Sequence, residues 1–166
     1  MGARNTVRDI DRGYRKLHKN LADGGAVSML VGVQGKEADE THQETEQTVG
    51  EVASINELGL GVPERSFLRA WMDENEASIM EDLRDVMRGV LVGRFTKEQG
   101  MQLLGVKYVA AIQERITAGI EPPNAPYTIA KKGSSTPLID TGQLKSAITF
   151  LLEAMISSMT GGGVTP

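Results

Sequence analysis

Two helical patterns separated by a short break dominate residues 62–119 and constrain the fold more than any other feature. The first is an apolar stripe at steps of three and four, whose members share one helix face: Ile79, Leu83, Val86 and Val90. Gly93 interrupts the pattern, and Thr96 with Gln99 has the spacing of a capping box that begins a new helix. The second stripe has the same spacing and ends before Gly119: Leu104, Tyr108, Ile112 and Ile116. Two helices with so short a connection are expected to pack as an antiparallel hairpin.

The segment before this hairpin predicts a helix followed by a strand. Apolar residues recur on one helix face: Val7, Ile10, Tyr14, Leu17 and Leu21. Basic residues occupy much of the remaining surface: Arg4, Arg8, Arg12, Arg15, Lys16 and Lys19. Asp23-Gly24-Gly25 is expected to stop the helix, because glycine readily adopts the left-handed cap conformation. In residues 26–33, AVSMLVGV, larger side chains alternate with smaller ones, which predicts a strand.

Residues 34–48, QGKEADETHQETEQT, contain no large apolar side chain. Such a segment cannot bury enough surface to offset its ordering entropy, so we predict a mobile acidic loop. The next segment, VGEVASINELG at residues 49–59, predicts a second strand. The two strands would then form an extended hairpin around the acidic loop.

The C-terminal third begins with an irregular, proline-containing stretch at residues 120–137. Loops of this length usually carry a function or cross a partner. Residues 147–156, AITFLLEAMI, predict a final strand, and residues 157–166 predict a flexible tail. The expected fold is α+β, with a single domain over residues 1–156. It combines a small, mostly antiparallel sheet with an N-terminal helix and a helical hairpin packed on one side.

The composition of the 166 residues excludes several classes of site. Without cysteine there is no disulfide framework, thiolate metal site or cysteine nucleophile. No apolar run approaches the roughly 18 residues that a membrane span needs, so we expect no membrane partner. The formal net charge of −4 argues against a dedicated nucleic-acid binder. We expect a cytoplasmic product without cofactor or metal.

Asp140-Thr141-Gly142 follows two bulky apolar residues, as the catalytic aspartate of an aspartic protease does. Such a protease sets two of these loops on a dyad in an almost wholly β scaffold, so that two carboxylates share one proton. This chain is mostly helical by pattern. We therefore interpret the tripeptide as a structural corner in which Asp140 or Thr141 caps a short helix. Leu144 and Ile148 are then expected to face inward.

Two blocks of the sequence resemble one protein family. The first contains Asn56-Glu57-Leu58-Gly59 and Val62-Pro63-Glu64-Arg65-Ser66-Phe67-Leu68, and the second Ala125-Pro126-Tyr127-Thr128-Ile129, Lys132-Gly133-Ser134 and residues 137–144. In order and spacing they resemble the HK97 gp10-like, or virion morphogenesis, family of bacteriophage neck and tail-completion proteins. Ser66 stands where that family usually has proline. The residues that carry the motif here are Arg65, Phe67, Leu68, Pro126, Thr128, Ile129, Lys132, Gly133, Pro137, Leu138, Ile139, Asp140, Thr141, Gly142 and Leu144.

The resemblance implies a structural, non-enzymatic component of a tailed-phage virion. Members of the family form a homo-oligomeric ring of six or twelve copies at the head-tail neck or the top of the tail. The implied partners are copies of the chain itself and the adjacent head-tail connector, tail-tube or sheath proteins. The residues themselves suggest that the loops 34–48 and 120–137 supply ring contacts. The acidic balance would suit a lumen through which phage DNA passes without specific binding.

Two other functions are open at this point. The chain could be an aspartic-type peptidase that uses Asp140, or a DNA-binding module that uses the basic first helix. His42 lies among carboxylates that could bind a divalent cation, but the spacing matches no defined metal loop, and a solvated acidic loop explains it better. His18 is expected at the surface. Trp71, near Phe67, is expected to anchor the start of a helix.

Overall fold

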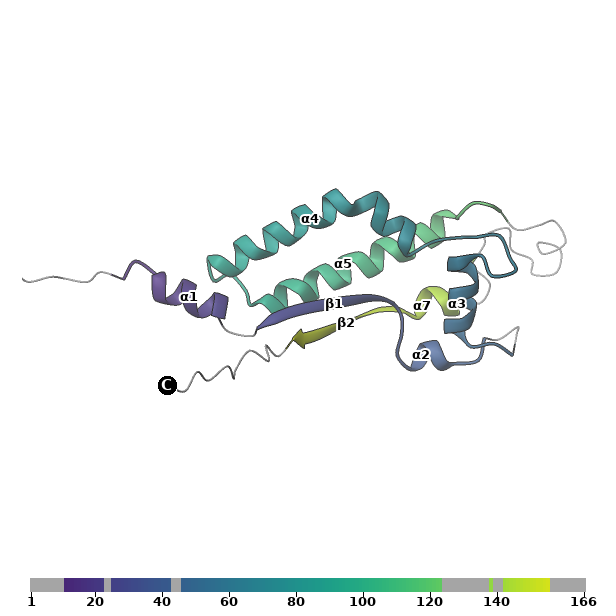
Figure 1. The fold of residues 1–166 in the computed structure, drawn as a ribbon, viewed down its shortest axis with the longest axis horizontal. Helices are drawn as coiled ribbons and strands as arrows, with labels where there is room; N and C mark the ends of the chain where they lie inside the picture. The colour runs from purple at the N-terminus through teal and green to yellow at the C-terminus, as the bar shows by residue number, and fades with distance from the viewer. Residues whose placement is uncertain (1–10, 23–24, 43–45, 124–137, 139–141, 156–166) are drawn as a thin grey trace, which may run out of the picture.

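A computed structural model describes residues 11–22, 25–42, 46–123, 138 and 142–155. The elements run in the order α1 (Tyr14–Ala22), β1 (Ala26–Val33), α2 (Lys36–Asp39), α3 (Val49–Leu58), α4 (Arg69–Leu91), α5 (Lys97–Ala118), α7 (Gln143–Ser146) and β2 (Ile148–Met155). Figure 1 shows an elongated molecule in which α4 and α5 run along a pair of strands. Helix α1 lies at one end, and α2, α3 and α7 gather at the other. The predicted α+β class is confirmed.

The helical hairpin of α4 and α5 forms where the sequence predicts it. Helix α4 ends at Leu91, and Gly93 adopts a positive φ of 72° in the connection. The capping box begins α5: Thr96 Oγ1 accepts from the Gln99 amide at 3.2 Å, and Gln99 Oε1 accepts from the Thr96 amide at 2.9 Å. These bonds satisfy amide donors that the first turn of a helix otherwise leaves unpaired.

The sheet consists of β1 and β2 paired antiparallel, with Ala26 opposite Met155 and Val33 opposite Ile148. The prediction of a second strand at residues 49–59 is therefore wrong, because residues 49–58 form α3. Thr48 and Glu51 make a capping box at its start, and Gly59 ends it in the left-handed conformation. Val49 and Ala53, one helical turn apart, are its buried residues. A spacing of four is that of one helix face and not the period of two that a half-buried strand shows.

Helix α5 lies between the other two layers. Its Gly105 is so close to β2 that an added Cβ would lie 2.4 Å from Phe150 Cδ2. An added Cβ on Gly89 of α4 would lie 2.2 Å from Phe95 Cζ, just before α5. The core that these contacts enclose is aliphatic apart from three aromatic rings: Val49, Ala53, Phe67, Trp71, Val86, Val90, Leu104, Tyr108, Ile112, Ile116, Ile120, Leu144, Ala147 and Ile148.

The acidic loop is more structured than its composition predicts. Residues 36–39 form the short helix α2, and Thr41 bridges to Thr48. The His42 amide donates to the Gln47 carbonyl at 2.8 Å, and the His42 side chain is buried. The prediction of a solvated His42 is therefore wrong, because its side chain is buried. Residues 34–42 and 46–48 are held by backbone hydrogen bonds and not by the burial of apolar side chains. Residues 43–45 lie outside the described part.

Helix α1 confirms the predicted N-terminal helix over Tyr14–Ala22, and the rest of the predicted stretch, residues 1–10, lies outside the described residues. The helix contains no buried residue, and its Tyr14 is 71% exposed. Its attachments to the body are polar. The Asn20 side-chain amide donates to the Val90 carbonyl at 3.3 Å, and Lys97 Nζ donates to the Leu21 and Gly25 carbonyls, both at 2.8 Å.

Candidate assembly surfaces

Arg65, in the first of the two blocks that carry the family resemblance, contacts the segment that leads into the second. Its side chain is 8% exposed, and its Nε donates to the Pro122 carbonyl at 2.9 Å. A second guanidinium nitrogen donates to the Pro123 carbonyl at 3.4 Å and a third to Asn56 Oδ1 at 3.5 Å. The planar fork of arginine suits several carbonyls in fixed positions, which a lysine cannot match. Arg65 therefore holds the start of the 120–137 loop against the segment before α4.

Glu57, at the end of α3, caps the N-terminus of α4 across the intervening turn. Its carboxylate accepts from Ser66 Oγ at 2.7 Å and from the amides of Phe67, Leu68 and Arg69 at 2.8, 3.0 and 2.8 Å. Leu68, the N-cap residue, supplies no side-chain cap of its own. Burial by itself raises the pKa of Glu57, but the four donated hydrogen bonds outweigh it and hold the pKa below its usual value.

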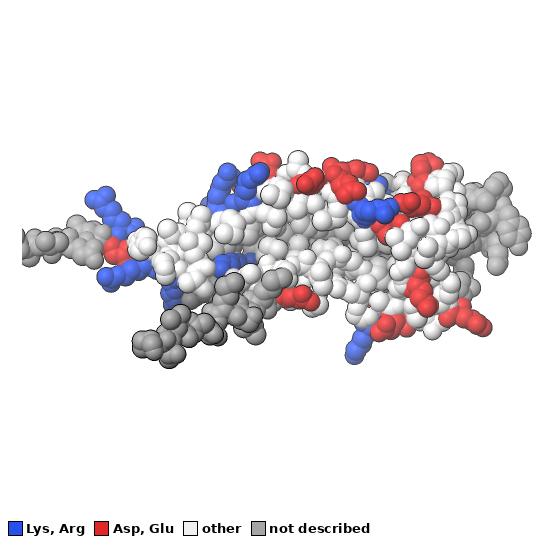
Figure 2. Space-filling view, viewed as in Figure 1, with Lys and Arg blue, Asp and Glu red and all other residues white. Residues whose placement is uncertain are grey.

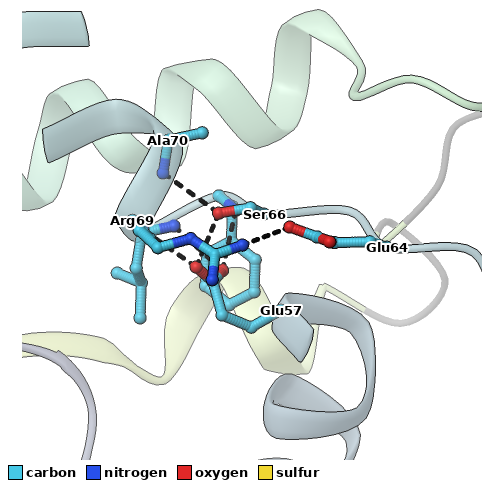
Figure 3. A network of polar contacts seen from close by, with 7 residues as sticks. Glu57, Glu64, Ser66, Arg69 and Ala70 are labelled. Carbon is cyan, nitrogen blue, oxygen red and sulfur yellow. Dashed lines mark hydrogen bonds and ion pairs between the residues drawn. The ribbon is translucent and has the colours of Figure 1, made fainter. Parts of the chain in front are cut away.

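Figure 3 shows how this cap extends to its neighbours. Ser66 Oγ, besides donating to Glu57, accepts from the Ala70 amide at 3.0 Å. Arg69 pairs with Glu64 at the surface. Ser66, at the position where the resembled family has proline, thus supplies a donor and an acceptor that proline lacks. Hydrogen bonds, and not the rigid side chain of a proline, fix the backbone at the start of α4.

The structure places only part of the predicted motif. Phe67 is fully buried, Leu68 packs against the core and Leu144 is buried, in agreement with the inward orientation expected of Leu144. Leu138 packs on the core with a positive φ of 65°, which is unusual for leucine. The remaining second-block residues lie outside the described part: Pro126, Thr128, Ile129, Lys132, Gly133, Pro137, Ile139, Asp140 and Thr141.

The short helix predicted after the Asp-Thr-Gly tripeptide is present as α7. Its N-cap is Gly142, in the left-handed conformation with φ 75°, and not Asp140 or Thr141. Glycine suits this position because it adopts such a φ at little cost, and the predicted capping residues Asp140 and Thr141 lie outside the described residues. Ile148 is buried as expected.

Apolar side chains are exposed along both helices of the hairpin. On α5, Leu103 and Val106 are 63% and 60% exposed. They belong to a face of α5 that contains no charged residue, the α5 stripe: Gln99, Gln102, Leu103, Val106, Ala110, Gln113 and Thr117. On α4, exposed apolar residues form a second face, the α4 stripe: Met72, Met80, Met87 and Leu91. The α4 stripe adjoins β1, since Met87 and Leu83 line one groove with Ala26 and Val27.

The sheet also has an uncovered face. Met29, Val31 and Val33 of β1 pack against the core, so the alternate residues point away from the helices. On that open face Leu30 lies opposite Leu151, and the two are 49% and 50% exposed. Large contiguous patches of exposed apolar surface usually mark an interaction site. Sequence reasoning missed this face because it assigned β1 the wrong partner.

Charge is distributed unevenly along the molecule. Figure 2 shows Lys and Arg gathered at the α1 end, and Asp and Glu at the opposite end and along α4. The basic end contains Arg12, Arg15, Lys16, Lys19, Arg94 and Lys97. The acidic end contains Glu37, Asp39, Glu40, Glu51, Glu64 and Glu121. The middle of the face in Figure 2, over α5 and the strands, is nearly free of charged atoms.

The described titratable groups with shifted pKa values are engaged in structural contacts. Burial, together with the Asp82 carboxylate that accepts from its hydroxyl at 3.2 Å, raises the pKa of Tyr108 to about 12. The Arg115 guanidinium lowers the pKa of Glu74. Among the described residues, no three His, Asp or Glu side chains lie together in a way that could hold a metal ion.

Comparison with family models finds no matching family, and neither the curated proteins nor the solved structures give a significant match. No helix in the described residues is both long and apolar enough to cross a membrane.

Proposed function

We propose that this chain is a non-enzymatic structural protein of a tailed-phage virion, one that forms a homo-oligomeric ring at the head-tail neck or the top of the tail. The ring would serve in tail completion or termination and connect head and tail. The observation that carries the proposal is the exposed apolar surface of the protomer. It extends over α1, the two stripes of the hairpin and the open sheet face, and such surface is normally covered by a partner.

The contacts between the first resemblance block and the segment that leads into the second support the same proposal. Arg65 and Asn56 belong to the first block, and they meet the backbone at Pro122 and Pro123, which leads into the second. Residues distant in sequence thus serve one structural joint. A joint of this kind positions residues 120–123, where the 120–137 loop begins, relative to the helical hairpin, as a ring protein needs if that loop contacts its neighbours.

The proposed partners are copies of the chain, six or twelve in number, and adjacent connector, tail-tube or sheath proteins. The separation of charge favours contacts in which the basic end of α1 meets an acidic surface on an adjoining virion protein. Phage DNA would pass through the lumen without specific binding, since acidic residues repel phosphate.

The basic end of the molecule also favours a second candidate, a DNA-binding module. Its cationic residues would then contact phosphates, and affinity would fall steeply as salt rises. The peptidase alternative requires an almost wholly β scaffold around Asp140. The described residues contain two strands and long helices, which is the opposite arrangement.

The experiment that tests the proposal is to purify intact particles and probe them for this chain, alongside negative-stain imaging of the purified protein. The proposal predicts rings of uniform diameter and a fixed copy number per particle. A salt-dependent DNA affinity without any assembly would favour the DNA-binding module. Peptide cleavage abolished by Asp140→Asn would favour the peptidase.

A further inference from the structure

Both strands of the sheet have one edge that no other described strand covers. The described sheet contains β1 and β2 alone, so the outer edge of each presents backbone N–H and C=O groups without a ladder partner. Each strand has eight residues, which gives an edge about 26 Å long. A sheet of two strands is at best marginally stable by itself, and an open edge is a template for pairing with another chain.

Of the features by which proteins protect such edges, β1 has none and β2 has one, the charge of Glu153. Natural edge strands are usually short, bulged, or interrupted by charge or proline. The β1 sequence AVSMLVGV has no charge and no proline, and β2, ITFLLEAM, has Glu153 as its single charged residue. The eight residues of β1 pair with those of β2 one to one, so the register contains no bulge. The β1 edge therefore has no residue that would oppose pairing with another strand, and the β2 edge has one.

Each open edge is next to one of the two stripes: the α5 stripe has no charged residue, and the α4 stripe has Glu76 between Met72 and Met80. The β1 side carries the α4 stripe, because Met87 and Leu83 line one groove with Ala26 and Val27. On α5, Gly105 faces the strands and lies beside Phe150. The α5 stripe is next to this face of the helix, on the side away from α4. The protomer thus has two different apolar flanks.

We propose that copies of this chain associate head to tail, so that the β2 edge of one copy pairs with the β1 edge of the next and the α5 stripe packs against the α4 stripe. This inference rests on the proposed ring and names its interface. A rotation axis parallel to the strands places β2 beside the next β1, and these two run in opposite directions, as β1 and β2 do within one copy. The result is one continuous antiparallel sheet.

The symmetry of the alternatives favours this arrangement. A twofold axis would pair β1 with β1, or β2 with β2, and leave the other edge of every copy open. Head-to-tail pairing covers both strand edges and both stripes of every copy with one repeated contact. When the copies form a closed ring, no edge is left open. The helices then lie on one side of the sheet throughout, and the open face with Leu30 and Leu151 lies on the other.

Disulfide trapping tests the pairing directly, because the chain contains no cysteine. Single-cysteine variants are made on the open face, Ser28→Cys on β1 and Thr149→Cys, Leu151→Cys or Glu153→Cys on β2. The β1 variant is mixed with each β2 variant in reduced form, assembled and then oxidised. Neighbouring strands place facing Cα atoms within the about 4.4–6.8 Å that a disulfide spans. At least one mixture is expected to give crosslinked dimers that neither variant forms alone.

Charge insertion tests the packing of the flanks. Val106→Glu and Leu103→Glu change residues that are exposed in the protomer, so circular dichroism should show an unchanged fold. They bury a charge in the proposed interface, and sedimentation velocity should show at least a tenfold weaker assembly. Ser78→Glu is the matched control, since it adds the same charge to an exposed position of α4 outside the α4 stripe.

The outcomes separate this inference from the proposed function. A wild-type chain that stays monomeric at every concentration overturns both. Wild-type rings that tolerate Val106→Glu and form no mixed crosslinks overturn the interface and leave the ring intact. Crosslinking of Ser28→Cys with itself would show a twofold pair, and open edges covered by a segment of the same chain would give no intermolecular crosslink. Either result contradicts head-to-tail pairing.

Discussion

Replacement of Glu57 tests whether one carboxylate holds α3 to the start of α4. The carboxylate accepts four hydrogen bonds, three of them from the backbone amides of Phe67, Leu68 and Arg69 where α4 begins. Hydrogen bonds to a charged group contribute about 1.5–3 kcal/mol each but do not add, and loss of a helix cap costs about 0.5–2 kcal/mol. We therefore expect Glu57→Ala to lower the free energy of unfolding by about 2–4 kcal/mol, and Glu57→Gln, which keeps one acceptor oxygen, by about 1–2 kcal/mol.

The dependence on pH gives this prediction a second readout. The folded-state pKa of Glu57 lies below its ordinary value of 4.5, so the carboxylate stabilises the fold above that pH. Its contribution is lost as pH falls through the folded-state pKa. Urea denaturation followed by circular dichroism should therefore show a difference between wild type and Glu57→Gln that is constant above about pH 5 and shrinks below pH 4.5.

Glu81→Ala is the control, because Glu81 is an exposed carboxylate on α4, outside the α4 stripe, for which the structure shows no cap. A substitution of this kind is expected to change stability by no more than about 0.5 kcal/mol. The reasoning would be refuted by a Glu57→Ala variant as stable as the control, or by a wild-type advantage over Glu57→Gln that persists undiminished at low pH.

Three further predictions concern the core and the second motif block. Phe67→Ala, at a fully buried ring, and Trp71→Ala, whose ring centroid lies 5.3 Å from that of Tyr108, should each cost about 3–5 kcal/mol in chemical denaturation, and a change near zero would mean that these rings face a partner. Gly105→Ala should lower the melting temperature, although alanine is the better helix former, because the added Cβ would clash with Phe150; a higher melting temperature would contradict the packing of α5 on β2. Asp140→Asn should leave assembly and stability nearly unchanged if the tripeptide is a corner, whereas loss of a measurable peptidase activity would contradict that role.

The helical hairpin could be predicted from the sequence because its signals are local. The break at Gly93 and the capping box of Thr96 and Gln99 lie within a few residues of the structure that they form. The partner of β1 could not be predicted in the same way. Ala26 pairs with Met155, at the far end of the chain, and no local pattern encodes such a pairing.

Residues 49–58 show how a local signal was outweighed by a wrong assumption. Thr48 and Glu51 have the same capping-box spacing as Thr96 and Gln99, and that spacing by itself predicts the helix start that α3 has. The role of Glu57 depends on a turn that folds back at Gly59, so its four bonds could not be read from spacing. The first block of the resemblance contains Asn56 and Glu57, but the resemblance predicts none of the contacts that these two residues make.

The most direct test of the central claim is the mass of the purified native assembly. A protein that works through surfaces offered to its own copies should be found by native mass spectrometry or light scattering at six or twelve times its 17.9 kDa protomer mass. A single species of 17.9 kDa at every concentration, absent from mature particles, would contradict the account.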